Sequence, residues 1–370
     1  MTDVADTDEA HRELAHRGEL LEVRSGRHQG FQAFRLPLRP RRLACPNTEG
    51  SIMRNSIKSL ANTPRAAEAP VPIAGIDQRS KVQWRDVALF TGLAYAFAWV
   101  LWIALRPNLF HLLSASHIPS KLLVPPIYEF GMFAPAAAAI VMRLFVSKEG
   151  LKDSLGPVRA WRFYALAVLL ATVVVSLVIG VDALTGLGTF TWNRKPALWI
   201  AYAGLAFDGL TYSALLALGE EYGWRGYLLP KLLPLGEVKA AVVVGAIWGT
   251  WHLPMLIAGL NYPGVGPLAA IGIFIPVAIA MSVLFARVFL ISGGAVLVAA
   301  VLHGSFNAFG DKLTNANHLT GSPLVVTPAG AVGIGVILIT AAIAYALSKT
   351  GRLQRRRVTA RVAASGHGVA

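Results

Sequence analysis

Long apolar segments recur through most of this chain, and they constrain its fold more than any other feature. From residue 86 onward the sequence repeatedly stays apolar for the ~20 residues that a helix needs to cross the hydrocarbon of a bilayer. Such segments span membranes as helices, because unpaired backbone groups are costly in lipid. The sequence therefore predicts an all-α membrane bundle of eight transmembrane helices. The predicted spans are Val87–Leu105, Ile127–Val146, Phe163–Leu184, Leu198–Leu218, Val238–Gly259, Pro267–Leu290, Gly294–Phe309 and Pro328–Leu347.

The composition excludes several classes of protein. Only 15% of the residues are charged and 55% are hydrophobic, whereas a soluble domain carries about a quarter charged residues. The net charge of +14 comes largely from the two ends, which hold 14 of the 34 Lys and Arg before residue 86 and six after residue 348. Basic ends on so apolar a chain indicate contact with a lipid bilayer and not with nucleic acid. The single cysteine, Cys45, excludes disulfide frameworks and thiolate zinc sites.

Three regions follow from these patterns. Residues 1–84 form a polar, Arg-rich extension that is expected to be disordered, residues 85–348 form the helical domain, and residues 349–370 form a basic tail. An even number of spans places both termini on one side, and the excess of Lys and Arg in the loops of that side predicts that it is cytoplasmic. The composition, rich in Ala, Gly and Val, favours a multi-pass protein of a bacterial cell membrane.

Ionisable residues inside a span cost several kcal/mol, so each is a candidate for function. Glu129, Arg143 and Asp182 lie near predicted span ends, and we expect them to reach headgroups or water. Asp208 lies deeper, and a polar contact between helices is as good an explanation for it as chemistry.

Two adjacent carboxylates, Glu220 and Glu221, follow the fourth apolar run. If the helix continues, Glu221 and Arg225 are four residues apart and share a face, so that Arg225 neutralises Glu221. Glu220 then points about 100° away around the helix and is available for a metal ion or a water molecule. The alternative is a helix that ends at the interface with two solvated carboxylates.

Two later segments carry histidine in apolar surroundings. His252 lies in the fifth predicted span, and His303 lies one helical turn before Asn307 in the seventh. Each alone is explained by packing or by a hydrogen bond between helices. Together with Glu220 they form a set of nitrogen and oxygen ligands that suits Zn²⁺, which activates water for hydrolysis, while a second carboxylate carries the proton to a departing amine. The chain has neither an HExxH motif nor a GxSxG motif.

The ordered set of motifs resembles the CPBP family of intramembrane proteases, which includes the CAAX-prenyl endopeptidases and bacteriocin-immunity-type membrane proteins. The matching region runs from about residue 85 to 348. The resemblance rests on Glu-Glu-x-x-x-Arg (Glu220 to Arg225), an aromatic residue ahead of a histidine (Trp248 and His252, where the family usually has Phe) and His-x-x-x-Asn (His303 to Asn307).

This resemblance implies a helical bundle with a polar cavity inside the bilayer and an endopeptidase that cuts a membrane-associated protein or peptide, lipidated chains included. Glu220 would be the catalytic carboxylate and His252 its partner. His303 and Asn307 would complete the site or form an oxyanion stabiliser, and Glu221 with Arg225 would support it. Two chemistries stay open: Glu220, His252 and His303 bind zinc, or Glu220 acts with the histidines as hydrogen-bond donors.

Two other classes of function fit part of the pattern. A non-catalytic scaffold or immunity protein would keep the fold around a degenerate site, although every motif residue is present here. A proton-coupled transporter would use Glu220, His252 and His303 as a relay, but the two halves of the chain show no internal symmetry.

Overall fold

A computed structural model describes residues 81–105, 128–158, 160–192 and 195–365, all of them in one compact unit, Glu68–Ala370. Side chains are described as far as residue 349, with 104 and 105 excepted. The extension predicted to be disordered, residues 1–84, lies outside the described residues except for its last four.

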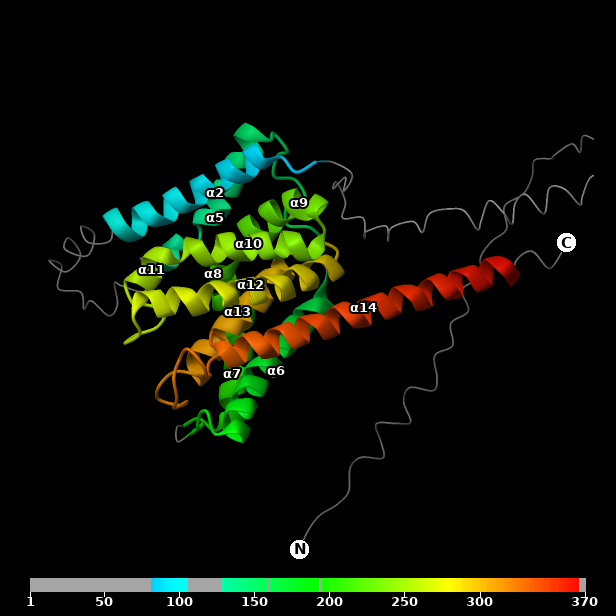
Figure 1. Ribbon diagram of the computed structural model, residues 1–370. Helices are drawn as coiled ribbons and strands as arrows, with labels where there is room; N and C mark the ends of the chain where they lie inside the picture. The colour runs from blue at the N-terminus through cyan, green and yellow to red at the C-terminus, as the bar shows by residue number, and fades with distance from the viewer. Residues whose placement is uncertain (1–80, 106–127, 159, 193–194, 366–370) are drawn as a thin grey trace, which may run out of the picture. The chain divides into compact units, whose positions relative to one another are not determined.

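The described part of the chain is almost entirely helical (Figure 1), so the all-α prediction is confirmed. The one extended pairing among these residues is an isolated bridge between Phe190 and Leu319. The helices, with π-helical turns labelled η1 to η3 and a 3-10 turn labelled η4, are α2 (Trp84–Trp99), η1 (Val100–Leu105), α5 (Ala134–Val141), η2 (Met142–Val146), α6 (Trp161–Thr185), α7 (Leu198–Leu210), α8 (Tyr212–Gly223), η3 (Trp224–Leu228), α9 (Leu229–Leu232), η4 (Leu233–Leu235), α10 (Glu237–Trp251), α11 (Leu253–Ile257), α12 (Pro267–Ile291), α13 (Val296–Leu313) and α14 (Ala331–Ser365).

Within the described ranges, six helices are long and apolar enough to cross a membrane, which is the pattern of a multi-pass integral membrane protein. The sequence predicted eight spans. Two of the eight, assigned to 238–259 and 294–309, correspond to α10 and α13, which do not have the length and apolar composition of the other six. The six are Trp84–Ile103, Tyr128–Val146, Trp161–Thr185, Leu198–Leu235, Pro267–Ile291 and Ala331–Lys349.

The fifth predicted span is not one helix. It divides at His252, where α10 ends and the short α11 begins. Pro254 explains the break, because a proline has no N–H to donate and its ring displaces the carbonyl four residues earlier. His252 therefore lies at a helix junction, where its backbone carbonyl accepts from the N–H groups of Met255 and Leu256 at 2.9 and 3.0 Å.

Helix α13 is buried by its neighbours. It packs against α6, α7 and α8, while α12 packs against both α10 and α14 (Figure 1). Glycine makes the closest approach possible: a Cβ at Gly304 would lie 2.4 Å from the backbone nitrogen of Ala214, too close for any side chain. The polar residues of α13 are thus held against α8, the helix that carries the two adjacent carboxylates.

Two of the outlying charged residues differ from expectation, and a third agrees with it. Asp182 is fully buried in α6 instead of reaching water, and neither of its carboxylate oxygens has a hydrogen-bond partner in the described structure. The side chain of Arg143 turns inward and is only 12% exposed. Asp208 of α7 accepts a hydrogen bond from Ser213 of α8 at 2.8 Å, so it makes the polar contact between helices that the sequence offered as one explanation. Sequence position within a span does not reveal which side of a helix faces its neighbours, and that side decides the cases of Asp182 and Arg143.

Candidate active site

Two glycines bring the backbone of α8 against the start of α5. A Cβ at Gly219 would lie 2.7 Å from the carbonyl oxygen of Met132, and one at Gly223 would lie 2.5 Å from Cβ of Pro135. The two glycines are four residues apart, the spacing that allows membrane helices to touch backbone to backbone. Glu220 and Glu221 lie between them, so this contact sets the depth and rotation of both carboxylates.

Glu221 forms an ion pair with Arg225 inside the bundle. The guanidinium NH1 lies 2.7 Å from Oε1 of Glu221, and both side chains are 0% exposed. The guanidinium also lies between the rings of Trp248 and Phe285, with its Cζ 5.1 and 5.0 Å from their centres. The pairing predicted from the four-residue spacing is therefore confirmed, and the helix does continue through the motif.

His303 contacts Glu221, a pairing that the sequence analysis did not foresee. Its Nδ1 lies 2.9 Å from Oε1 of Glu221, the oxygen that also accepts from Arg225. An ionised carboxylate only accepts, so Nδ1 carries the hydrogen, and a neutral ring in this tautomer has its lone pair on Nε2. No described residue bonds to that Nε2. The sequence placed His303 and Asn307 on one face but held no signal for which carboxylate that face would meet.

Glu220 is 2% exposed and is held by two indole groups. Its Oε2 accepts hydrogen bonds from Nε1 of Trp248 at 2.6 Å and from Nε1 of Trp224 at 3.3 Å. Its Oε1 has no partner in the described part of the chain. Trp224 is a site residue that the sequence analysis missed, although its position four residues after Glu220 was a usable signal.

His252 is fixed at the junction of α10 and α11. Its Nδ1 lies 2.9 Å from the carbonyl oxygen of Trp248, which can only accept, so the neutral ring again has its lone pair on Nε2. Helix α2 secures this end of α10, because Nε1 of Trp99 donates to the carbonyl of Trp251 at 2.9 Å. That carbonyl directly precedes His252, so the contact fixes the backbone from which the imidazole projects.

The indole of Trp248 joins the acid and the two histidines. It donates to Glu220, and its ring centre lies 5.9 Å from that of His252 and 5.2 Å from that of His303. His252 also interacts electrostatically with Glu220 and with His303. The three groups, from α8, the end of α10 and α13, are thus gathered around one side chain, and all three are buried.

Asn307 lies one turn after His303 on α13 and is half-buried. It forms no hydrogen bond with any described residue, and no contact in this part of the chain joins it to Glu220. Its side-chain amide is therefore a donor without a partner, next to the imidazole of His303 along the helix.

The site has one feature that suits zinc and one that does not. The lone pairs on Nε2 of His252 and His303 are the form that a metal needs, and each Nδ1 is anchored as in many metal sites. Within the described ranges, however, no group of three or more His, Cys, Asp or Glu side chains is arranged to hold a metal ion. The described side chains therefore form no preassembled zinc site, and zinc binding by Glu220, His252 and His303 stays a prediction.

Fold and site together describe a multi-pass membrane protein with a buried carboxylate and two imidazoles around a shared indole. Residues 202–309 match the family described as type II CAAX prenyl endopeptidase Rce1-like. The chain thus carries a domain of the Rce1-like CAAX prenyl endopeptidase (CPBP) family, a family of membrane proteases, as the motifs predicted. The match contains all six predicted site residues and covers a minority of the 370 residues. No curated protein matches the chain significantly.

Proposed function

We propose that this protein is an intramembrane endopeptidase that hydrolyses a peptide bond of a membrane-associated protein or peptide. One observation carries the proposal: Glu220, His252 and His303 gather around Trp248, and each is anchored through one atom. The second polar atom of each has no partner among the described residues. Groups held in this way are available to water and substrate without the cost of rearranging.

The proposed reaction uses Glu220 as the general base. Its Oε1 takes a proton from water while the water oxygen attacks the carbonyl carbon of the peptide bond, and Nε2 of His252 orients the water by accepting its other hydrogen. The C–N bond of the tetrahedral intermediate then breaks, and the proton on Glu220 passes to the departing nitrogen. The products are a carboxylic acid and an amine, and Glu220 returns to its ionised form.

The negative oxygen of the intermediate needs a donor, and the tautomers decide which residue supplies it. Because both neutral imidazoles accept at Nε2, neither donates there unless it is protonated. The amide of Asn307 is a donor in either case, so we assign it to the oxyanion. Such a donor accounts for about 3–4 kcal/mol of transition-state stabilisation in other hydrolases.

Glu221, Arg225 and His303 form the support of the site in this proposal. Arg225 balances the charge of Glu221, and Glu221 fixes the tautomer and orientation of His303. This chain of contacts links α8, which carries Glu220, to α13, which carries His303.

We further propose that α10 and α13 lie at membrane depth within the bundle, which gives eight helices in the bilayer around a polar cavity with both termini cytoplasmic. The burial of α13 by three neighbouring helices supports this arrangement. A bacterial cell membrane is the proposed location. The substrate class includes lipidated chains, because the family is named for prenylated CAAX proteins.

The experiment that tests the function uses purified protein in nanodiscs. A prenylated CAAX peptide, the same peptide without its prenyl group, and membrane proteins of the host are each incubated with the protein, and mass spectrometry detects new termini. We expect new termini that vanish with Glu220→Gln and persist with Glu129→Gln, a matched change outside the site. Equal cleavage by the Glu220→Gln variant would contradict the proposal, and so would no cleavage of any of the three by the native protein.

A further inference from the structure

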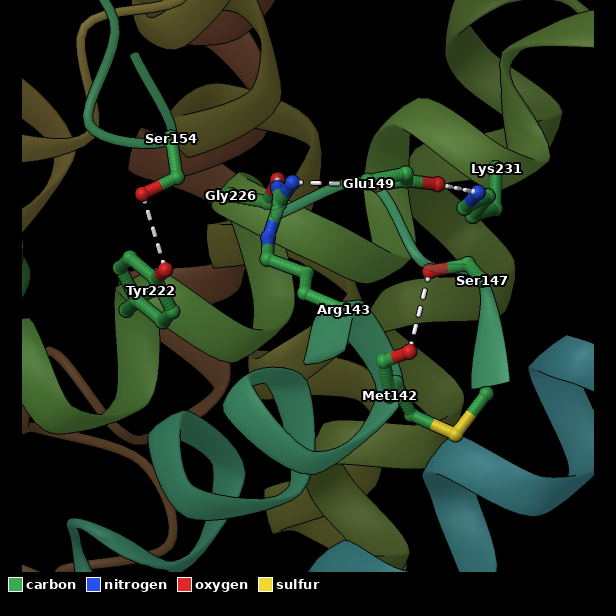
Figure 2. Close-up of polar contacts among 8 residues, drawn as sticks. All are labelled: Met142, Arg143, Ser147, Glu149, Ser154, Tyr222, Gly226 and Lys231. Atoms are coloured by element: carbon green, nitrogen blue, oxygen red, sulfur yellow. Dashed lines mark hydrogen bonds and ion pairs between the residues drawn. The ribbon is translucent and has the colours of Figure 1, made fainter. Parts of the chain in front are cut away.

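Arg143 makes contacts that link η2 to η3, the π-helical turn that follows α8 (Figure 2). Its NH2 donates to the carbonyl oxygen of Gly226 at 2.7 Å, and its NH1 donates to Glu149 at 3.0 Å. Its Cζ lies 5.9 and 5.5 Å from the ring centres of Tyr222 and Tyr227. A guanidinium with these partners is aimed at one backbone carbonyl of the turn that follows Glu220 and Glu221.

That carbonyl lacks its usual donor. In an α-helix the carbonyl of Gly226 would accept from the N–H of residue 230, but residue 230 is proline. The proline ring also displaces the carbonyl four residues before it, and the chain here adopts the π-helical turn η3, in which the N–H of Leu229 reaches back to Trp224. The N–H that an α-helix would supply to this carbonyl is therefore absent, and the guanidinium of Arg143 donates a hydrogen to it.

The turn η3 carries two of the groups that hold the site. Trp224 donates to Glu220, and Arg225 pairs with Glu221. Both residues directly precede Gly226. A shift of η3 therefore moves the partners of both carboxylates at once.

We propose that Arg143 is a positioning residue of the active site: it replaces the N–H that Pro230 lacks, holds η3 through Gly226, and thereby sets Trp224 and Arg225 against Glu220 and Glu221. This inference rests on the proposed function of the site. It adds a residue outside the matched region 202–309 to the parts that the reaction needs.

The surrounding loop keeps Arg143 in place. Glu149 pairs with both Arg143 and Lys231, and Tyr222 donates to Oγ of Ser154 at 2.9 Å (Figure 2). The carbonyl of Leu155 in the same loop accepts from the N–H of Val296 at the start of α13, at 3.0 Å. The loop between η2 and α6 thus contacts both α8, through Tyr222, and α13, the helix that bears His303.

A double-mutant cycle tests the role of Arg143 without any substrate. Arg143→Met, Pro230→Ala and the double variant are compared with the native protein in nanodiscs by amide hydrogen exchange of peptides that cover residues 222–232. We expect Arg143→Met to speed exchange about tenfold, the effect of losing a hydrogen bond from a charged donor. In the Pro230→Ala background residue 230 has its own N–H, and the same change should speed exchange less than about threefold. Equal factors in both backgrounds would overturn the proposal.

Kinetic measurements are the second test. They separate a role of Arg143 in positioning the site from a role in stability alone. Per folded enzyme, Arg143→Met should lower kcat about tenfold with KM within about twofold, and Arg143→Lys should recover part of the loss. Arg162→Met is the matched control, because Arg162 is exposed and its one interaction among the described residues is with the ring of Phe163. A kcat unchanged in Arg143→Met overturns the positioning role. Absence of turnover in the native protein would instead count against the proposed function and would leave the exchange cycle to decide on Arg143.

Discussion

Oε1 of Glu221 accepts from both His303 and Arg225, at 2.9 and 2.7 Å, so one buried oxygen joins α13 to the turn η3. The carboxylate next to it, Glu220, forms no hydrogen bond with either of these groups and is bonded to two indoles instead. Adjacent glutamates therefore have separate tasks. Glu221 holds the structure around the site, and Glu220 keeps one oxygen for the reaction.

Loss of Arg225 should mainly affect folding. Arg225→Met keeps the bulk of the side chain between Trp248 and Phe285 but leaves Glu221 buried without its counter-ion, so the free energy of unfolding should fall by about 3–5 kcal/mol. Thermal or denaturant unfolding in detergent measures the loss, with Arg162→Met as the exposed control. A stability within error of the native protein would show that the pair does not support the fold.

The pair should be easier to replace than to break. Glu221→Gln alone leaves Arg225 charged in the interior, whereas Glu221→Gln with Arg225→Met leaves no buried charge. We expect the double variant to lose less stability than the sum of the two single losses. Additive losses, measured by the same unfolding assay, would mean that the two side chains act independently.

A substitution at Trp248 can remove the indole N–H and still leave an aromatic side chain. Trp248→Phe retains an aromatic side chain between the two histidines but deletes the N–H that bonds Glu220 at 2.6 Å. Turnover should fall about tenfold or more, since a buried hydrogen bond to a charged group is lost, while the fold persists. Trp199→Phe serves as the control because Trp199 is 74% exposed. Equal turnover by Trp248→Phe and the native protein would remove the indole from the site.

The close contact between α8 and α5 predicts a steric effect. Gly223→Ala places a methyl group about where Pro135 already lies, so the helices must separate and stability should fall by about 1–3 kcal/mol. Gly204→Ala is the matched control, since a Cβ there meets nothing within 4 Å. The two variants should differ clearly in melting temperature, and identical melting would contradict the packing role of Gly223.

Sequence patterns identified the helices and the local pairings well, because both depend on residues close together in the chain. Apolar length marked every long span, and the spacing of Glu221 and Arg225 was enough to predict their ion pair. The break at His252 was missed, because Val238–Gly259 was predicted as one span, although Pro254 was a signal for the end of a helix. The spans assigned around α10 and α13 were harder to judge, because helices buried by other helices tolerate shorter and more polar sequences.

Contacts between distant segments were not predictable from this one sequence. The meeting of His303 with Glu221, of Trp248 with Glu220 and of Arg143 with Gly226 each depends on how whole helices rotate against one another. Glycines such as Gly219 and Gly304 control those rotations by allowing close approach, yet their spacing does not name the helix that they touch. The same gap explains the buried Asp182, whose side of α6 faces the bundle.

The central claim, that Glu220 and His252 act in one site on one water molecule, is tested most directly by the kinetics of Glu220→Gln, His252→Ala and the double variant. Groups that act as a unit lose their effect together, so the account predicts that the double variant is no slower than the slower single variant. The measurement is kcat/KM for each protein in nanodiscs, corrected for folded fraction. A double variant whose loss equals the product of the two single losses would contradict a shared site.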